Sequence, residues 1–361
     1  FIEHAFLEPE VGLAWTDEND VVNIRVSTQV IEHFRFIADA IGVPHNKVRI
    51  RGAMVGGGFG GKEDITVEIY LALLAKHTDR PVRLEFTRED SFMGHGNRHP
   101  FTMTYKTGVT KDGKITAIDV NMIADAGAYV YLSPYVVLYA AVAAPGPYQV
   151  DNLNVDAMAV ATNNMYTSAF RGFGAAQACI AYEQQMDEIA NKLGIDRIEL
   201  RRRNYLQSGD PISTGFRVQS AVWTEQCVDK AWAALGQPSE AEDHIRIGRG
   251  VAAYQQCYGR LTFLHDTSEA WVGVEVDGTV IVRSGVTDIG AGQISALGQI
   301  AVEILGVTLD DVVIYNSDSA VTPLAGTTTA TRALYMTGNA VRKAAEAVRV
   351  RLVERAAAEF G

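Results

Sequence analysis

The chain has 361 residues, 47% of them hydrophobic, and a formal net charge of −11. This length suggests two or three domains of about 150 residues, or one large domain, with enough apolar residues for a substantial core. The acidic balance argues against nucleic acid as the main partner, because phosphates are bound by clustered Lys and Arg. The longest apolar run, roughly 135–145, is too short to span a bilayer, so no membrane partner is expected.

The chain has three cysteines, which lie far apart and form no CxxC pair: Cys179, Cys227 and Cys257. This spacing argues against an iron–sulfur cluster, a Cys-rich zinc site or a disulfide framework within the chain. It fits a reducing compartment, and we predict a cytoplasmic location. We expect His33, His95 and His99 to be surface or structural residues and not direct metal ligands.

The first half of the chain mixes strand and helix patterns. We expect a strand at 21–27, a helix at 29–43, a strand at 47–55 and, after a glycine loop, a helix at 64–78. Residues 102–127 alternate with period two around Asp112-Gly113, which predicts a long antiparallel hairpin. This order of elements is typical of α/β or α+β folds.

The second half begins after a polar stretch that contains Gly and Pro. We place a domain boundary there, near 238–248, between helices predicted at 178–194, 197–206 and 220–236 and the elements that follow. These are a strand at 250–257, a hairpin at 269–285 around Asp277-Gly278, a helix at 296–306, a strand at 311–318 and a long helix from Ala340.

The stretch "GGGFGGKED", Gly56 to Asp64, nearly spells a phosphate-binding P-loop. A P-loop would place Ser or Thr after Lys62 to hold magnesium, whereas this chain has Glu63, which would repel phosphates. A plain strand-to-helix turn is the second alternative, although five glycines are costly in unfolded-state entropy for a turn alone. The third alternative is a loop whose backbone N–H groups approach another anionic ligand.

Three more loops have compositions suited to polar ligands: "TSAFRGFGAAQ" (167–177), "TDIGAGQIS" (287–295) and "AGTTTATR" (325–332). Arg171 could hold a phosphate or oxo group by bidentate hydrogen bonds. Phe173, beside glycines, could be a rigid wall for a flat substrate, or Phe170 and Phe173 could be ordinary core residues. Together the four loops suggest one large, multi-anionic ligand gripped from two domains.

The motifs "STQ", "GGGFGGKE", "AFRGFGAAQ" and "TGNAV", in this order, resemble the molybdenum hydroxylase family of xanthine dehydrogenases and aldehyde oxidases. The resemblance runs over essentially the whole chain, and its first half is also similar to split bacterial enzymes of the nicotinate dehydrogenase type. It implies the central part of the molybdopterin-binding large subunit. By this resemblance the N-terminal hammerhead domain and the C-terminal stretch with the catalytic glutamate are missing, so this chain alone should not turn over substrate.

The resemblance also implies the fold and the chemistry. The expected fold is α+β, with two molybdopterin-binding domains of mixed sheets and packed helices, 1–240 and 241–361, and the cofactor between them. The implied activity is hydroxylation of an aromatic N-heterocycle or an aldehyde, with water as the oxygen source. The implied cofactor is molybdenum-molybdopterin, in the cytosine dinucleotide form of many bacterial members. Iron–sulfur clusters and FAD are expected on partner chains of a hetero-oligomer.

The resemblance assigns roles to residues at the matching positions. Gln29 matches the glutamine that hydrogen-bonds the apical oxygen of molybdenum, and Glu63 matches a carboxylate that hydrogen-bonds the substrate ring. Arg171 matches the arginine whose loop contacts the metal ligands, and Phe173 the phenylalanine that stacks on the substrate. The residues expected to bind the cofactor are Gly57, Gly58, Phe59, Gly60, Gly61, Phe170, Arg171, Gly172, Gly290, Gly292, Gln293, Thr328, Thr329 and Asn339.

Two positions depart from the family pattern. The third loop commonly reads G-Q-G, whereas here Gly290-Ala291-Gly292 displaces Gln293. Tyr139 stands near the place of an arginine that binds purines, so the substrate need not be a purine. Besides the hydroxylase, two alternatives remain open: an aldehyde-specific oxidoreductase, and a cofactor-free scaffold that kept the fold.

Overall fold

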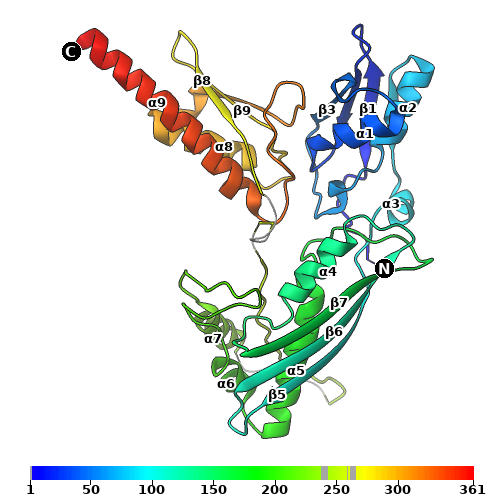
Figure 1. Ribbon diagram of the computed structural model, residues 1–361, viewed down its shortest axis with the longest axis vertical. Helices are drawn as coiled ribbons and strands as arrows, with labels where there is room; N and C mark the ends of the chain where they lie inside the picture. Colours follow the sequence, from blue (N-terminus) through cyan, green and yellow to red (C-terminus); the bar gives the residue numbers. More distant parts are fainter. Residues whose placement is uncertain (1, 237–242, 258, 261–265) are drawn as a thin grey trace. The chain divides into compact units, whose positions relative to one another are not determined.

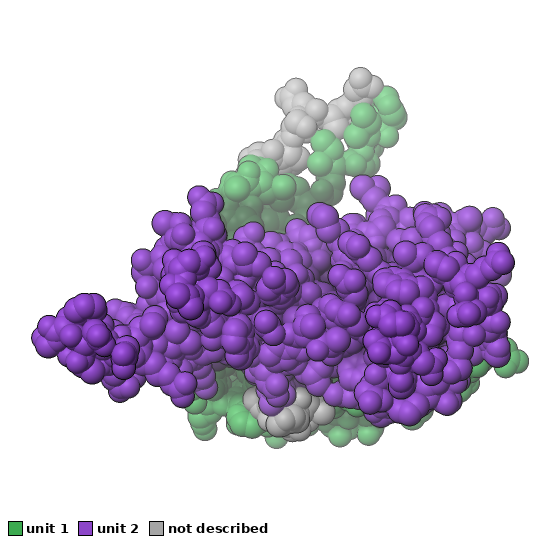
Figure 2. Space-filling view, turned by 90° about the horizontal axis from the view of Figure 1, so that it is seen from above, with its two compact units in different colours: residues 1, 98–257 green, residues 2–97, 258–361 purple. Residues whose placement is uncertain are grey.

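The computed structural model describes residues 2–236, 243–257, 259–260 and 266–361. They form two compact units, traced in Figure 1 and coloured in Figure 2. The central unit is Arg98–Cys257, and the discontinuous unit combines Ile2–Asn97 with residues 259–361. The start of the expected boundary, 238–242, lies outside the described residues. The division into domains 1–240 and 241–361 stays a prediction.

The N-terminal part of the discontinuous unit is a four-stranded sheet with the order β3-β2-β1-β4. Its strands are β1 Val11–Thr16, β2 Val22–Val26, β3 Val48–Gly52 and β4 Val82–Glu85. β1 is antiparallel to β2 and β4, whereas β2 and β3 are parallel and are joined through α1, Phe34–Ile41. α2, Glu68–Thr78, completes a core in which Ile24, Ile37, Ile50 and Leu71 are fully buried.

The C-terminal part of this unit is a three-stranded sheet with the order β10-β9-β8. Its strands are β8 Trp271–Val274, β9 Val280–Ser284 and β10 Val312–Asn316, and β9 and β10 are parallel. Helices α8, Gln293–Leu305, and α9, Gly338–Phe360, cover it. The two parts of the unit meet where Arg49 donates to both carboxylate oxygens of Asp318, at 2.9 and 2.7 Å.

The central unit is a three-stranded sheet, order β5-β6-β7, packed against helices. β5 Phe101–Val109 and β6 Ile115–Gly127 form the antiparallel hairpin, and β7 Asn152–Ala161 runs parallel to β6. Helices α4 Ser133–Val142 and α5 Ala175–Leu193 lie on the sheet in Figure 1, followed by α6 Arg197–Arg202 and α7 Thr224–Leu235. One face of each strand is less exposed than the other and packs on the helices, β5 on α5 and β7 on α4, as the alternating pattern predicts.

Short helical turns connect these elements: Ile31–His33, His45–Lys47, Gly61–Glu63, Leu309–Asp311, the π-turn Ala333–Thr337, and α3, Arg88–Gly94. The prediction of an α+β fold with mixed sheets is confirmed. The strand predicted at 250–257 is wrong, because the described residues there form no ladder. Instead the carbonyl of buried Ala253 accepts a hydrogen bond from the Tyr182 hydroxyl. No helix among the described residues has both the length and the apolarity needed to cross a membrane.

Candidate cofactor site

Gln29 joins two loops of the discontinuous unit. It follows β2, is 2% exposed, and its side-chain Oε1 accepts from the Gly60 amide at 3.0 Å while Nε2 donates to the Thr328 carbonyl at 2.8 Å. Its backbone also forms a hydrogen bond outside any helix, because Gln29 N donates to the Lys62 carbonyl at 2.8 Å. These backbone contacts explain why the predicted helix at 29–43 begins later, at Phe34.

The glycine loop, Gly56 to Gly61, needs glycine for conformation and for space. Gly57 and Gly60 have φ of 111° and 103°, where glycine is favoured. A Cβ at Gly58 would lie 2.4 Å from Gln29 Oε1. Phe59 also has positive φ, 51°, and is 42% exposed, which is the kind of strained residue that often marks a functional loop. The bare backbone of this loop therefore faces Gln29.

Lys62 does not serve this loop as the lysine of a P-loop would. It is 1% exposed, and its Nζ lies 2.8 Å from Glu8 Oε1 and 4.5 Å from the centre of the Phe6 ring. Burial lowers the pKa of Lys62, and Glu8 opposes that shift. The ammonium is thus engaged by protein groups, which counts against the nucleotide alternative.

Glu63 has the strongest electrostatic perturbation of the predicted site residues. Burial, with a contribution from Asp64, raises the pKa of Glu63 to about 7, and nearby Thr329, Arg260 and Arg332 oppose the shift. Its Oε2 is buried and has no hydrogen-bond partner among the described residues. A carboxyl group with this pKa can donate or accept a hydrogen bond near neutral pH.

Thr287 and Thr328 complete the set of hydrogen bonds that links Gln29 to the surrounding loops, which we call the Gln29 joint. Thr287 Oγ1 donates to the Gln29 carbonyl at 3.0 Å, Thr328 N donates to the same carbonyl at 3.1 Å, and Thr328 Oγ1 donates to the Thr287 carbonyl at 2.8 Å. Arg332, 1% exposed, supports the 325–332 loop by donating to the carbonyls of Ala325 and Thr327. Thr328 is therefore a structural part of the joint, and sequence reasoning missed Thr287, for which the polar, glycine-containing loop that it opens was the only signal.

The loop at 287–295 turns its amides onto its own aspartate. Asp288 Oδ1 accepts from Gly290 N at 3.0 Å and Gly292 N at 3.3 Å, and Oδ2 accepts from Ile294 N at 3.3 Å. Gly290 and Gly292 have positive φ, 103° and 76°, and Gln293 begins α8. Asn339 is exposed on α9, where its Nδ2 donates to the Tyr335 carbonyl. Of these predicted cofactor contacts, the amides of Gly290 and Gly292 already donate hydrogen bonds to the Asp288 carboxylate.

The remaining predicted site residues lie in the central unit, on the turn that precedes α5. Phe173 has positive φ, 38°, between Gly172 and Gly174, and its ring meets Tyr139 edge to face at 5.3 Å. Arg171 is exposed. A Cβ at Gly174 would lie 2.2 Å from the Val136 carbonyl, so this turn packs directly against α4.

Arg98 supports this turn and was missed by sequence reasoning. Its guanidinium stacks 3.8 Å above the Phe170 ring, and Nη2 donates to the Arg171 carbonyl at 2.8 Å. Burial lowers the pKa of Arg98. Nearby His99 is 2% exposed with its pKa lowered to about 4 by burial, and like His33 (3%) and His95 (1%) it is buried, so the surface alternative for these histidines is wrong.

The structure thus gathers Gln29, the glycine loop, Glu63, Thr328 and Thr329 in the discontinuous unit. It gathers Phe170, Arg171, Gly172 and Phe173 in the central unit. Gly290, Gly292 and Gln293 form a further group at the start of α8. The roles of these residues stay predictions.

A buried amide faces bare glycine backbone, and Glu63, two residues after that loop, has a carboxyl group with a raised pKa; groups of this kind suit a protein that binds a polar ligand. The chain matches two models of the molybdopterin cofactor-binding domain, over residues 1–205 and 226–361. It belongs to the molybdenum hydroxylase family of xanthine dehydrogenases and aldehyde oxidases.

Individual relatives agree with this assignment. The nicotinate dehydrogenase large molybdopterin subunit of Eubacterium barkeri is 42% identical over 231 residues, which cover 64% of this chain and 54% of the relative. The xanthine dehydrogenase molybdenum-binding subunit of Escherichia coli is 33% identical over 99% of this chain and 48% of its own length. The solved aldehyde oxidoreductase of Desulfovibrio desulfuricans superposes with a TM-score of 0.85 at 30% identity, over 95% of this chain and 38% of that one. The chain spans about half the length of the curated relatives it matches.

Three observations test whether these residues fit a molybdopterin. Gln29 Nε2 donates one hydrogen to the Thr328 carbonyl, and its second hydrogen has no acceptor among the described residues. Glu63 Oε2 is buried without a partner in the described part of the chain. The glycine loop is bare where it meets Gln29, because a Cβ at Gly58 would lie 2.4 Å from Gln29 Oε1. The group fits at the Gln29 joint. It fits less well at Gly290 and Gly292, whose amides Asp288 already binds.

Proposed function

We propose that the chain is the cofactor-binding part of an enzyme that hydroxylates an aromatic N-heterocycle or an aldehyde, taking the oxygen from water. The observation that carries this proposal is the Gln29 joint, where one buried amide binds both the glycine loop and the 325–332 loop. Such an arrangement holds a side-chain donor in a fixed position before any ligand arrives, which is how enzymes preorganise a polar site.

In this proposal the side chains bind and orient, and the molybdenum cofactor when bound supplies the redox and Lewis-acid chemistry. Gln29 would donate its second amide hydrogen to the cofactor. Glu63 would hydrogen-bond the substrate, as donor or acceptor according to the ring atom it meets, because its pKa of about 7 leaves both forms populated at neutral pH. Arg171 would contact the cofactor side, and Phe173 would provide an aromatic face for a flat substrate.

The finer assignments belong to the same proposal. The cofactor would carry a cytosine dinucleotide tail, and iron–sulfur and flavin groups would be supplied by partner chains in a cytoplasmic hetero-oligomer. The names of two relatives support a division among subunits, since one is a large molybdopterin subunit and the other a molybdenum-binding subunit. The chain's three cysteines have no CxxC spacing, so an iron–sulfur cluster would come from elsewhere.

One observation favours a second candidate, a cofactor-free scaffold with the same fold. Asp288 binds the amides of Gly290, Gly292 and Ile294, so a phosphate that approached them would meet a carboxylate. The scaffold alternative predicts that no molybdenum accompanies the intact protein, whereas the hydroxylase requires it.

Glu63 also separates the two substrate classes. The intact complex is assayed with a redox dye against nicotinate, a purine and an aromatic aldehyde, as wild type and as Glu63→Gln. A heterocycle hydroxylase predicts that Glu63→Gln lowers kcat/KM for the heterocycle about tenfold or more, while any aldehyde activity changes little, because an aldehyde offers no ring nitrogen to bind. Equal losses on all substrates would contradict a role of Glu63 in recognising the ring.

A further inference from the structure

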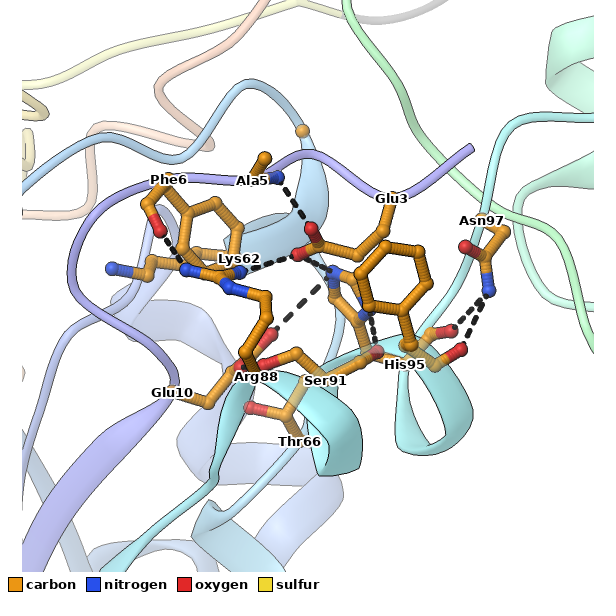
Figure 3. A network of polar contacts seen from close by, with 12 residues as sticks. Glu3, Ala5, Phe6, Glu10, Lys62, Thr66, Arg88, Ser91, His95 and Asn97 are labelled. Atoms are coloured by element: carbon orange, nitrogen blue, oxygen red, sulfur yellow. Dashed lines mark hydrogen bonds and ion pairs between the residues drawn. The ribbon is translucent and has the colours of Figure 1, made fainter. Parts of the chain in front are cut away.

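The segment before β1, Glu3 to Glu10, forms no regular secondary structure, but ion pairs hold it in place. Glu8 pairs with Lys62, which follows the glycine loop, and Glu3 pairs with Arg88 of α3. We call this segment the strap. Figure 3 shows how its side chains point toward Lys62, Arg88 and His95. Four residues of the strap are less than 9% exposed: Glu3, His4, Phe6 and Glu10. Burial to this degree is unusual for the two glutamates unless their carboxylates are paired.

The first tie joins both ends of the glycine loop to Glu8. Glu8 Oε2 accepts from the amide of Gly56, the first residue of the loop. Glu8 Oε1 pairs at 2.8 Å with Nζ of Lys62, the residue that follows the loop. The same Nζ donates to the Glu8 carbonyl at 3.3 Å. One carboxylate therefore connects the two ends of the loop.

The second tie anchors the strap to α3. Arg88 Nη1 donates to Glu3 Oε1 at 2.8 Å, and Arg88 Nη2 donates to the Phe6 carbonyl. The Phe6 ring has Arg88 at 5.5 Å on the one hand and Lys62 at 4.5 Å on the other, so two cations contact one aromatic ring. The Arg88 contacts fix the strap independently of the loop.

A third contact, between the strap and Gly61, explains why the last residue of the glycine loop is a glycine. A Cβ at Gly61 would lie 2.8 Å from His95 Nε2, 2.9 Å from Phe6 Cε1 and 3.0 Å from His4 Nδ1. His95 is itself held, because its Nδ1 lies 2.7 Å from the Ser91 carbonyl and the Ser91 hydroxyl donates to Glu10. Glycine is thus required at position 61 by the strap and His95, whatever the loop binds.

We propose that the strap is a positioning element for the cofactor loop, and that the Glu8–Lys62 ion pair is its principal tie. This inference rests on the proposed function, in which the glycine loop receives the cofactor. Glu8 and Lys62 touch no ligand in it. They act by holding Gly56 and Gly61 in the conformation that presents the loop backbone, and Gly60 in particular, to Gln29.

A metal ion is the competing explanation for the buried groups, since Glu3, His4 and His95 offer ligand atoms within 4.8 Å of one another. The observations favour the strap, because both Glu3 oxygens already accept hydrogen bonds, from Arg88 at 2.8 Å and from the Ala5 amide at 2.6 Å. An arginine on a carboxylate competes with a cation for the same lone pairs.

The test uses the full-length protein with its partners, as wild type, Glu8→Gln, Lys62→Met and the double variant. Molybdenum and pterin per chain are measured, together with the thermal midpoint and the amide exchange of Gly56 and Gly61. Val341→Ala, in the fully buried core beneath the other sheet of the same unit, is the control for destabilisation alone. Glu8→Gln leaves Lys62 buried without a counter-charge, and the double variant removes that charge as well.

The strap predicts that Glu8→Gln lowers molybdenum content and speeds exchange at both glycine amides about tenfold. In the double variant the thermal midpoint recovers, whereas molybdenum content stays low, because the loop ends are still untied. Recovery of molybdenum together with stability, or equal losses in Val341→Ala, would overturn the proposal. So would stoichiometric zinc in the wild type that His4→Ala removes. Wild type without molybdenum would instead refute the proposed function.

Discussion

Gln29→Glu is the most informative single substitution, because it changes one buried donor into an acceptor with almost no change of shape. The Oε1 position would keep its bond from Gly60 N at 3.0 Å. The other oxygen would face the Thr328 carbonyl at 2.8 Å, and two acceptors at that distance repel unless a proton lies between them. The new carboxyl group must therefore be protonated to preserve the joint.

The order of magnitude of the effect follows from another buried carboxyl group. Glu68, 1% exposed in the same unit, has its pKa raised to about 7 by burial. A new carboxyl with the same folded pKa, against about 4.3 in the unfolded chain, contributes stability below about pH 4.3 and loses it as the pH rises through about 7. The loss amounts to about 1 kcal/mol at pH 5 and about 3–4 kcal/mol at pH 8.

Native-state amide exchange in β2 measures this loss, because a chain of two units need not unfold in one transition. Wild type, Gln29→Glu and Gln29→Ala are compared between pH 5 and 8. Gln29→Ala removes both hydrogen bonds and should cost about 2–4 kcal/mol at every pH. If the cost of Gln29→Glu does not grow with pH, or if Gln29→Ala shows the same growth, the geometry of the joint is wrong.

Three further predictions concern groups around the loops. Glu63→Gln should stabilise the protein relative to wild type by about 2–3 kcal/mol more at pH 8 than at pH 5, because wild-type Glu63 loses stability as the pH rises from about 4.3 through about 7. Thermal midpoints at the two pH values measure this, and a constant difference would contradict it. Arg98→Lys should destabilise the turn around Arg171 by about 1–2 kcal/mol through loss of a donated hydrogen bond and a planar stack, seen as faster amide exchange before α5. Unchanged exchange there would mean that Arg98 does not support the turn. Asp288→Ala should destabilise the start of α8 by about 1–2 kcal/mol, whereas Asp288→Asn retains an acceptor and should lose less. Similar losses in both variants would point to charge and not to capping.

The sequence predicted most of the elements because their signals are local. The hairpin around Gly113 and the strand–helix–strand order depend on alternation, helical spacing and turn residues within a few positions. The failed strand at 250–257 shows the limit. Its residues have strand-like composition, but Ala253 is held by Tyr182, which lies 71 residues earlier.

The site was predicted in its parts but not in its connections. Glycine spacing pointed to the loop, yet nothing local indicates that Gln29 reaches Thr328, 299 residues away. The same holds for Lys62, whose place in the motif resembles a phosphate ligand but whose partner is Glu8, 54 residues earlier. Arg98 and Thr287 were missed for this reason. Contacts of this kind arise from the tertiary fold, and no periodicity encodes them.

The central claim is that the Gln29 joint and its glycine loop hold a molybdenum-pterin cofactor. Metal analysis of the intact native complex, with chromatography of the released pterin, tests it most directly. The account predicts about one molybdenum and one pterin per chain, with cytosine monophosphate released on hydrolysis, and a marked loss of both in Gln29→Ala. An intact complex with no molybdenum would contradict the account and leave the scaffold alternative.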